Sequence, residues 1–299
     1  MAEQIIAYCE FDPASPGPFT QYLLPHIAAQ ARREPERFAA LGAVWREYAV
    51  GAAAVRLEDP EQPEPAVLES LFVDPQARGQ GAGAGLLRRA AEAARRRGAK
   101  ALSVSYALSG AELEAFDRMV RAMGAEPAFH APVYTIDSAA FHDSPALGAA
   151  FSPDYVPPPQ IVPFSRLSAE QRQALDARED VPEFVSPAAR KKLLDEALSL
   201  AWVENGAVAG FVLGCESAPG SFTQLGVWRA QDAPQGCFRA LQLAHVNLCY
   251  YYGGGDFLYH LSAVTERSEE LVQRVTGGKY RLLEEHLAVI ALESSEKRK

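Results

Sequence analysis

A glycine-rich loop that joins a β-strand directly to an amphipathic helix restricts a chain to a small group of folds, and this sequence contains such a segment. Residues 66–73 have the apolar and β-branched content of a strand, which Asp74-Pro75 ends. The loop Arg78-Gly79-Gln80-Gly81-Ala82-Gly83 follows. The helix predicted next ends at Gly98 and has an apolar stripe, formed by Leu86, Leu87, Ala90 and Ala94.

Such a loop predicts a binding site for phosphate or pyrophosphate. Glycines leave successive backbone N–H groups open to one concavity, and the first helical turn adds unpaired donors and partial positive charge. A Rossmann site would need GxGxxG near the first strand of the fold, and a Walker site would need Gly-Lys-Ser/Thr. Here Gly85 is followed by Leu86, so neither of these nucleotide-binding motifs fits.

The segment resembles motif A of the GNAT superfamily of N-acetyltransferases. In that motif a strand ends in Val-Asp-Pro and continues as Gln/Arg-x-x-Gly-x-Gly/Ala into a helix. Here Val73-Asp74-Pro75 is followed by Gln76-x-x-Gly79-x-Gly81. The resemblance covers residues 4–137 by order of elements and the second half of the chain at the level of the fold.

The same order of predicted elements occurs twice along the chain. Gln4–Cys9 and Gln160–Phe164 read as opening strands, and each is followed by a helical region with breaks. The β-rich stretches Ala43–Leu57 and Leu200–Cys215 come next, the second with a hairpin turn at Asn205-Gly206. Each half then reads strand, loop, helix, strand, helix, strand.

Spacing supports the duplication. From Val73 to Gly124 is 51 positions (124 − 73), and from Val227 to Gly278 is also 51 (278 − 227). Both glycines come at the predicted end of a helix, where a left-handed residue commonly stops it. The two halves therefore read as tandem copies of one fold.

A proline-rich segment separates the copies. Consecutive prolines cannot continue a helix or a central strand, so residues 139–159 read as an interdomain linker. We predict an α/β (α+β mixed sheet) protein of two tandem GNAT-like domains, each a mostly antiparallel sheet flanked by helices. The first is a catalytic domain at residues 1–138, and the second is a degenerate copy at residues 160–299.

The resemblance implies that the first domain binds acetyl-CoA as co-substrate and transfers the acetyl group directly to an amine, without a covalent enzyme intermediate or a metal. It implies that backbone amides of the loop hold the pyrophosphate and that the main chain of residues 71–73 pairs with the pantetheine as an added strand. The cofactor-binding residues expected are Leu71, Phe72, Val73, Arg78, Gly79, Gln80, Gly81, Ala82, Gly83 and Ala84.

Glu69 is the carboxylate best suited to act on the acceptor amine. An amine with a pKa of about 10 is mostly protonated at neutral pH, so a base or a short water chain must take a proton before attack. Glu69 precedes Leu71 by two positions on the predicted cofactor strand, and similar family members carry a carboxylate in this part of the strand. Base catalysis, binding of a cationic acceptor and an ordinary solvated strand residue all stay open.

The family's usual general acid is missing. It is often a Tyr four positions before the Gly that ends the following helix, and that position (124 − 4 = 120) is Val120. Tyr106, which follows the predicted strand Ala101–Ser105, is the replacement we expect; Tyr134 is an alternative. A thiol with a pKa of about 8.5 is a fair leaving group, so protonation by solvent also suffices.

The second half has no equivalent glycine loop. An offset of 154 positions (227 − 73) aligns residues 232–237, Asp-Ala-Pro-Gln-Gly-Cys, with residues 78–83. Pro234 lacks an N–H, and Asp232 brings negative charge where a pyrophosphate would lie. We therefore expect this half to bind no CoA and to complete the acceptor site.

Composition excludes several classes of protein. The 299 residues are 48% hydrophobic and 22% charged, which fits folded domains, and the net charge of −9 argues against nucleic acid and mildly favours cationic substrates. No stretch reaches the roughly 20 apolar residues of a membrane span, and no leader is recognisable, so we expect a cytoplasmic protein without a membrane partner. The spacing of the cysteines argues against a zinc site, because they form no CxxC pair and have no His nearby in ligand spacing. These residues are Cys9, Cys215, Cys237 and Cys249.

The function expected is therefore N-acyl transfer from acetyl-CoA to an amine of a small molecule or peptide. The alternative, motivated by the missing tyrosine at Val120, is a non-catalytic acyl-CoA sensor or interaction protein. A monomer is plausible because a tandem chain imitates the dimer of single-domain relatives, and a homodimer stays open.

Overall fold

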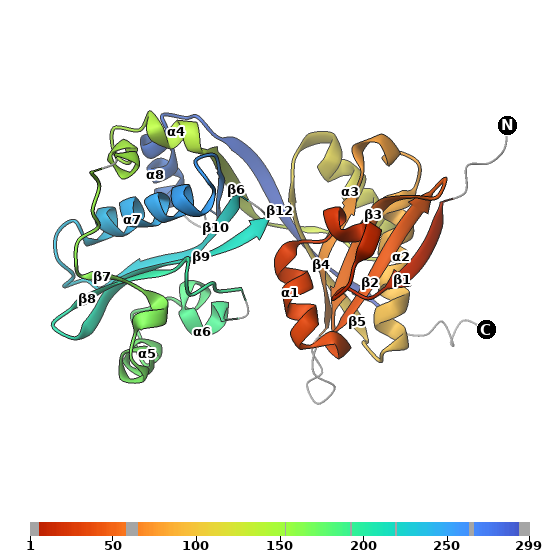
Figure 1. Cartoon of the computed structure of the whole chain (residues 1–299), viewed down its shortest axis with the longest axis horizontal. Coiled ribbons are helices and arrows are strands. Elements are labelled where there is room, and N and C mark those ends of the chain that lie inside the picture. The colour runs from red at the N-terminus through yellow and green to blue at the C-terminus, as the bar shows by residue number, and fades with distance from the viewer. Residues whose placement is uncertain are drawn as a thin grey trace. The chain divides into compact units, whose positions relative to one another are not determined.

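The computed structural model describes residues 6–57, 65–152, 154–191, 193–218, 220–262 and 266–292. The chain divides into two compact units, one formed by residues up to His130 together with those from Glu284 onward, and the other by Ala131–Leu283. Figure 1 labels the elements of both. Residues 4 and 5 of the expected first strand lie outside the described residues. In the structure this strand, β1, begins at Ala7.

The first unit is built on a mixed sheet with the order β1-β2-β3-β4-β5-β12. Its neighbouring strands pair antiparallel except β4 and β5, which run parallel. The turn between β2 and β3 contains two residues of positive φ, Arg46 and Glu47, as a tight hairpin requires. The strands are β1 Ala7–Phe11, β2 Phe38–Trp45, β3 Tyr48–Arg56, β4 Ala66–Val73, β5 Ala101–Leu108 and β12 Arg281–Ala291.

Helix α2 (Ala82–Arg96) covers β2, β3 and β4 and carries the core of this unit. Its buried face combines Leu86 and Leu87 with alanines, and small side chains let the helix approach the alanine-rich centre of β3 closely. Gly98 adopts a left-handed conformation and ends the helix, as predicted. The other helices are α1 Pro25–Arg33 and α3 Gly110–Ala122, with short 3-10 turns at Gly17–Tyr22, Pro35–Arg37 and Pro75–Ala77.

The second unit repeats this sheet with the order β7-β8-β9-β10-β11-β6. Here too one pair is parallel, β10 and β11, and the others are antiparallel. The predicted hairpin is present, with positive φ at Asn205 and Gly206. The strands are β6 Ala128–Asp137, β7 Ile161–Pro163, β8 Leu200–Glu204, β9 Ala207–Ala218, β10 Ser221–Arg229 and β11 Leu258–Ser262.

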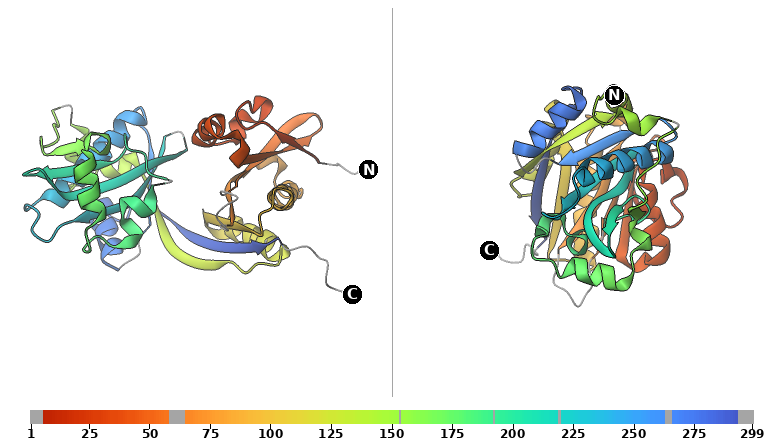
Figure 2. Two further views of the ribbon diagram at one scale, coloured as in Figure 1. Left: turned by 90° about the horizontal axis from the view of Figure 1, so that it is seen from below. Right: turned by 90° about the vertical axis from the view of Figure 1, so that its left-hand side faces the viewer.

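Helix α7 (Cys237–Tyr252) lies across β8, β9 and β10 of the second unit, as α2 does in the first (Figure 2, right). Its core residues include Leu241 and Ala244. The remaining helices are α4 Ser138–His142, α5 Ala169–Asp176, α6 Pro187–Arg190 and α8 Glu266–Thr276, with 3-10 turns at Gly148–Phe151, Phe164–Arg166 and Glu183–Val185. The predicted tandem duplication of an α/β mixed-sheet fold is therefore confirmed.

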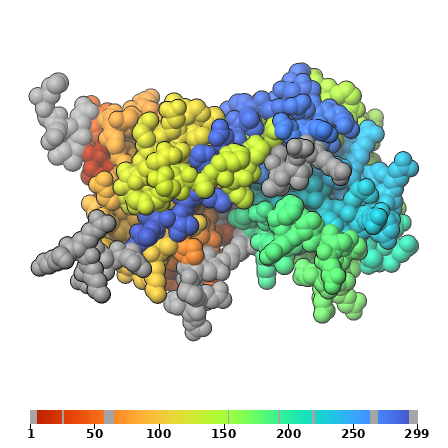
Figure 3. Space-filling model, turned by 180° about the vertical axis from the view of Figure 1, so that it is seen from behind, coloured from red at the N-terminus to blue at the C-terminus, as the bar shows by residue number. Residues whose placement is uncertain are grey.

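The final strand of each sheet comes from the other half of the sequence. Residues Glu284 to Ala291 of β12 pair with β5 in the first unit, and Val133 to Asp137 of β6 pair with β11 in the second. Figure 3 shows the end of β12, in dark blue, at the surface among residues of the N-terminal half. The two compact units consequently differ from the predicted ranges 1–138 and 160–299, because alternation identifies a strand but not its partner.

The predicted linker at residues 139–159 is partly packed against the second unit. It contains α4 and the 3-10 turn Gly148–Phe151, and Phe141, Leu147 and Ala150 are buried in that unit's core. Among the described residues, no helix is long and apolar enough to cross a membrane.

Candidate active site

The parallel strands β4 and β5 separate along their length. Their pairing runs from Ala66 opposite Leu102 to Leu68 opposite Val104 and then stops, although β4 continues to Val73. On the other edge, β4 stays paired with β3 as far as Val73. The main chain of residues 71–73 therefore has no strand partner on its β5 side within the described part of the chain.

A β-bulge at Glu69 accompanies this separation. Between β3 and β4, Ala54 lies opposite Ser70 while Val55 lies opposite Leu68, so Glu69 is the extra residue. A bulge bends its strand and increases the local twist, which moves the end of β4 away from β5. The expected strand Ala66–Val73 is thus present with its predicted bounds, and its bend falls on the residue chosen as the catalytic carboxylate.

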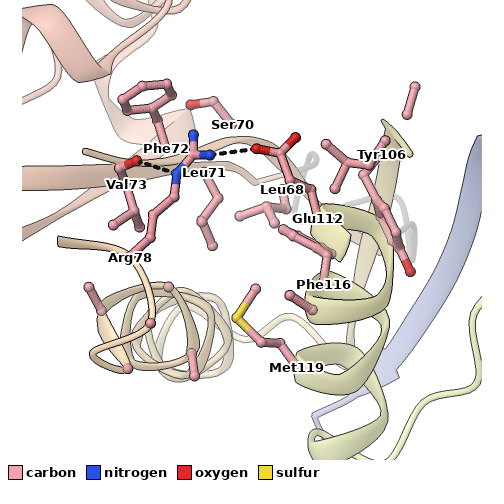
Figure 4. Close-up of a pocket in the computed structure, with 18 of the residues that line it drawn as sticks. Leu68, Ser70, Leu71, Phe72, Val73, Arg78, Tyr106, Glu112, Phe116 and Met119 are labelled. Atoms are coloured by element: carbon pink, nitrogen blue, oxygen red, sulfur yellow. Dashed lines mark hydrogen bonds and ion pairs between the residues drawn. The ribbon is translucent and has the colours of Figure 1, made fainter. Parts of the chain in front are cut away.

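A cavity of about 630 Å³ occupies the space between the two strands, which is ample for a cofactor arm. One wall is β4 from Leu68 to Val73, and a second is the end of β5. The glycine loop forms one end, and α3 forms the remaining side (Figure 4). Of the expected cofactor-binding residues, Gln80 alone does not line this cavity.

The loop has the backbone geometry that its glycines predict. Gly79 and Gly81 have φ of 75° and 86°, in the left-handed region where other residues cost roughly 1–2 kcal/mol. Gly81 is the N-cap residue of α2, and the N–H of Gly85 bonds its carbonyl at 2.9 Å. Ala82 and Gly83, in the first turn of α2, face the cavity with N–H groups that have no partner inside the helix.

Arg78 is fixed at the mouth of the loop (Figure 4). Its Nε donates to the carbonyl of Val73 at 3.2 Å, and its Nη1 lies 2.5 Å from Oε1 of Glu112 on α3. Both charged side chains are about half exposed, so the pair is screened by solvent and of modest strength. An anion bound at the loop would therefore compete with Glu112 for the Arg78 guanidinium.

Glu69 lines the cavity but is also paired. Its Oε1 accepts a hydrogen bond from Nε of Arg56 on β3 at 2.5 Å, and both side chains are less than one-fifth exposed. A half-buried ion pair holds this carboxylate in one orientation. The structure therefore brings Glu69 to the cavity together with a cation that sequence reasoning did not associate with it.

Tyr106 also lines the cavity, but its hydroxyl turns away from the glycine loop (Figure 4). It donates to Oδ1 of Asp117 at 2.6 Å, and Nδ1 of His286, from β12, lies 3.1 Å from the same oxygen. Burial raises the pKa of Tyr106, and the hydrogen bond to Asp117 adds to the effect. The alternative, Tyr134, is buried in the core of the second unit against Tyr280.

Helix α3 supplies a wall that sequence reasoning missed. Glu112, Phe116 and Met119 line the cavity from positions i, i+4 and i+7 of this helix. Figure 4 shows Phe116 and Met119 directed into the space opposite β4. The helical spacing was visible in the sequence, but it does not tell which face meets a cavity. Val120, at the position of the family's usual tyrosine, is fully buried in the core.

The second unit has a different loop at the same place. Gly236 is the left-handed N-cap of α7, as Gly81 is of α2, so the offset there is 155 (236 − 81) and not the predicted 154. With this correction Pro234 takes the place of Gly79 and Phe238 that of Gly83. A proline cannot adopt the positive φ of Gly79, and a phenylalanine fills space that Gly83 leaves open. The loop is degenerate.

The first unit thus combines a mixed sheet, a parallel pair that separates, and a glycine loop at a helix N-terminus. Residues 6–112 match the model of the acetyltransferase (GNAT) family. The sequence has no significant match among curated proteins.

Solved structures extend this likeness over the whole chain. It is similar to a tandem GNAT protein from the clavulanic acid biosynthesis pathway (15% identity, TM-score 0.65, covering 98% of this chain and 100% of that chain). It is also similar to a GCN5-related N-acetyltransferase from Sphaerobacter thermophilus (17% identity, TM-score 0.57, covering 97% of this chain and 96% of that chain). A third similar structure is a putative acetyltransferase from Pyrococcus horikoshii (11% identity, TM-score 0.54, covering 100% of this chain and 92% of that chain). At these identities the likeness establishes the fold.

The N-terminal half therefore matches the acetyltransferase (GNAT) family over residues 6–112, and the fold of the whole chain is that of tandem GNAT proteins. Within the described residues, no group of three His, Cys, Asp or Glu side chains could hold a metal ion.

Proposed function

We propose that the first unit binds acetyl-CoA and transfers its acetyl group to a primary amine. The observation that carries this proposal is the continuity of two features in one cavity: the unpaired edge of β4 at residues 71–73 and the glycine loop at residues 78–83. An extended amide-containing arm can pair with a free strand edge, while a pyrophosphate suits a helix N-terminus. The thioester supplies an activated acyl group with a thiol leaving group.

The residues present fit such a molecule. The left-handed Gly79 and Gly81 turn the backbone so that the N–H groups of the first turn of α2 are free. The Arg78 guanidinium at the mouth adds positive charge once a phosphate displaces Glu112. On α3, Phe116 and Met119 supply an apolar wall that excludes water from the arm.

We further propose that Glu69 receives the acceptor. Its carboxylate is less than one-fifth exposed and faces the cavity, where it attracts an ammonium group and accepts a proton directly or through water. The Arg56 guanidinium fixes its orientation through Oε1. The site therefore suits binding of a cationic amine followed by proton transfer to the carboxylate, directly or within a short water chain.

Tyr106 is not needed as the acid in this proposal. A hydroxyl whose pKa lies above 10 gives up its proton unfavourably to a thiolate whose conjugate acid has a pKa of about 8.5. The Tyr106 hydroxyl also already donates a hydrogen bond to Asp117. We propose that solvent protonates the thiolate and that Tyr106 positions α3 against β5.

Tyr106→Phe is accordingly expected to lower kcat by less than about threefold, because general acid catalysis by this residue would contribute about 100-fold or more. Steady-state thiol release under saturating acetyl-CoA measures the effect, with the thermal midpoint recorded to detect lost stability. A fall of 100-fold in kcat in a variant that remains folded would restore Tyr106 as the general acid.

The function itself is tested by thiol release from acetyl-CoA with a panel of polyamines, aminoglycosides, amino acids and peptide N-termini. We expect turnover with at least one acceptor, with a preference for cationic ones, since Glu69 and the net charge of −9 favour them. Tight binding of acetyl-CoA without release with any member would favour the acyl-CoA sensor instead. Absence of binding would overturn the assignment of the loop.

A further inference from the structure

The second unit contains a cavity of its own, of about 420 Å³. It is lined by residues of the parallel pair β10 and β11, of the first turns of α7 and of the second half of α8. This is the place within the unit that corresponds to the cofactor cavity of the first, since β10, β11, α7 and α8 repeat β4, β5, α2 and α3. The sheet and helices have therefore kept a cavity although the loop has lost its glycines.

The walls of this cavity are almost entirely apolar. Such a lining gains free energy by burying a hydrocarbon chain and offers few hydrogen bonds to a sugar or a peptide. Its apolar side chains include Ile136, Leu147, Val227, Leu261, Val272 and Val275.

One buried amide interrupts this lining. Gln224 on β10 is 6% exposed, and its Oε1 accepts a hydrogen bond of 2.7 Å from the hydroxyl of Tyr259. That hydroxyl also lies 2.7 Å from Nδ1 of His245. The chain of bonds fixes the amide, and Nε2 of Gln224 makes no hydrogen bond within the described residues. Because Gln224 lines the cavity, this amide nitrogen can donate to an oxygen of a ligand there.

Two arginines border the same cavity. Arg239 in the first turn of α7 and Arg274 near the end of α8 are exposed residues of its lining. Arg239 has a weak contact of 3.5 Å with the carbonyl of Ala146, and neither guanidinium has a carboxylate partner among the described residues. An apolar cavity with cations at its mouth complements a molecule with a hydrocarbon chain and an anionic head.

CoA itself does not fit these features. Pro234 and Phe238 stand where the first unit has Gly79 and Gly83, so the backbone cradle for a pyrophosphate is absent. The head group that two separate guanidiniums and an amide can hold is a single small anion. Its oxygens accept, as all three side-chain groups donate.

We propose that the second unit binds a medium-chain fatty carboxylic acid, with the chain in the apolar cavity and the carboxylate held by Arg239, Arg274 and Gln224. The proposal is independent of the acyl transfer assigned to the first unit. It gives the degenerate copy a ligand of its own.

The test is titration calorimetry of the full chain with octanoate, decanoate and dodecanoate. We expect one equivalent to bind, with affinity increasing about fourfold per CH2 until the cavity is full, since each buried CH2 contributes about 0.8 kcal/mol. Decanol and methyl decanoate, which lack the charge, should bind about 10- to 100-fold more weakly than decanoate. Equal affinity for decanoate and its methyl ester would overturn the proposed head-group site.

Variants locate the site. The double substitution Arg239→Ala and Arg274→Ala removes two exposed side chains and should weaken decanoate binding at least about tenfold. Arg229→Ala, which removes an exposed arginine of β10 outside the lining, is the matched control and should leave affinity unchanged. Val275→Phe should block the chain and spare thermal stability. No binding of any acid to the parent would refute the proposal. Undiminished binding in the double variant would also refute it, because the acid would then lie elsewhere, for example in the cavity of the first unit.

Discussion

Gly81→Glu is expected to reduce the affinity of the chain for acetyl-CoA by about 100-fold or more. Gly81 has a φ of 86°, so any side chain there strains the backbone by roughly 1–2 kcal/mol in the conformation that leaves the N–H groups of the loop open to a phosphate. A carboxylate within about 6 Å of a phosphate adds roughly 3 kcal/mol of repulsion at an effective dielectric constant of about 20. Together these terms exceed the 2.8 kcal/mol or so that a 100-fold loss requires.

Titration calorimetry of the full chain measures this loss, and two variants separate its causes. Gly81→Ala carries the strain without the charge and should lose less affinity than Gly81→Glu. Gly236→Glu places the same change at the equivalent left-handed N-cap of α7 and should leave acetyl-CoA affinity unchanged. The parent should bind one equivalent per chain. Full affinity in Gly81→Glu, or a second equivalent lost in Gly236→Glu, would mean that the cofactor lies elsewhere.

Glu69→Gln is expected to lower kcat by about 100-fold while leaving the affinity for acetyl-CoA within about twofold of the parent. Gln keeps the size of the side chain but neither attracts an ammonium group nor accepts its proton, and a positioned base is worth about 100-fold or more. A selective loss in kcat and in kcat/KM for the amine is the pattern of a group that acts on the acceptor.

Glu112→Gln is the matched control for this effect. Glu112 is the other carboxylate that lines the cavity, and it is about 60% exposed and paired with Arg78. Its neutralisation should change kcat less than about threefold and should strengthen acetyl-CoA binding, because it frees Arg78 for a phosphate. Equal kcat in the parent and in Glu69→Gln, at every pH between 6 and 9 or so, would assign Glu69 to pairing with Arg56 alone.

Local features of the chain were predictable from the sequence. The strand Ala66–Val73, the helix that ends at Gly98 and the hairpin at Asn205-Gly206 all lie where the residues indicate. Each depends on a pattern within a few residues. The strand follows from the alternation of its side chains, and the helix end and the hairpin follow from glycines that adopt a positive φ. The loop of residues 78–83 belongs to this group, because its geometry follows from the glycines and the helix start together.

The features that were not predictable depend on contacts distant in sequence. Asp117 is bonded by Tyr106 and His286, and the His286 contact spans 169 positions. The pairing of Glu69 with Arg56 depends on the register of β3 and β4, which includes a bulge. The one-residue error in the offset has a local origin: Val73 and Gly81 are 8 positions apart (81 − 73), whereas Val227 and Gly236 are 9 apart (236 − 227), so the second loop is one residue longer.

The exchanged strand β12 has a consequence for how the protein is made. During translation the first unit leaves the ribosome with an incomplete sheet, because the partner of β5 is not synthesised until residues 284–291. Until then β5 presents an unpaired edge, and Asp117 lacks His286. A nascent chain in this state must hold an open strand edge while more than 150 further residues are added, which takes on the order of ten seconds or longer at 5–20 residues per second. Shielding of that edge until β12 is made is therefore a requirement of synthesis that the finished fold no longer displays.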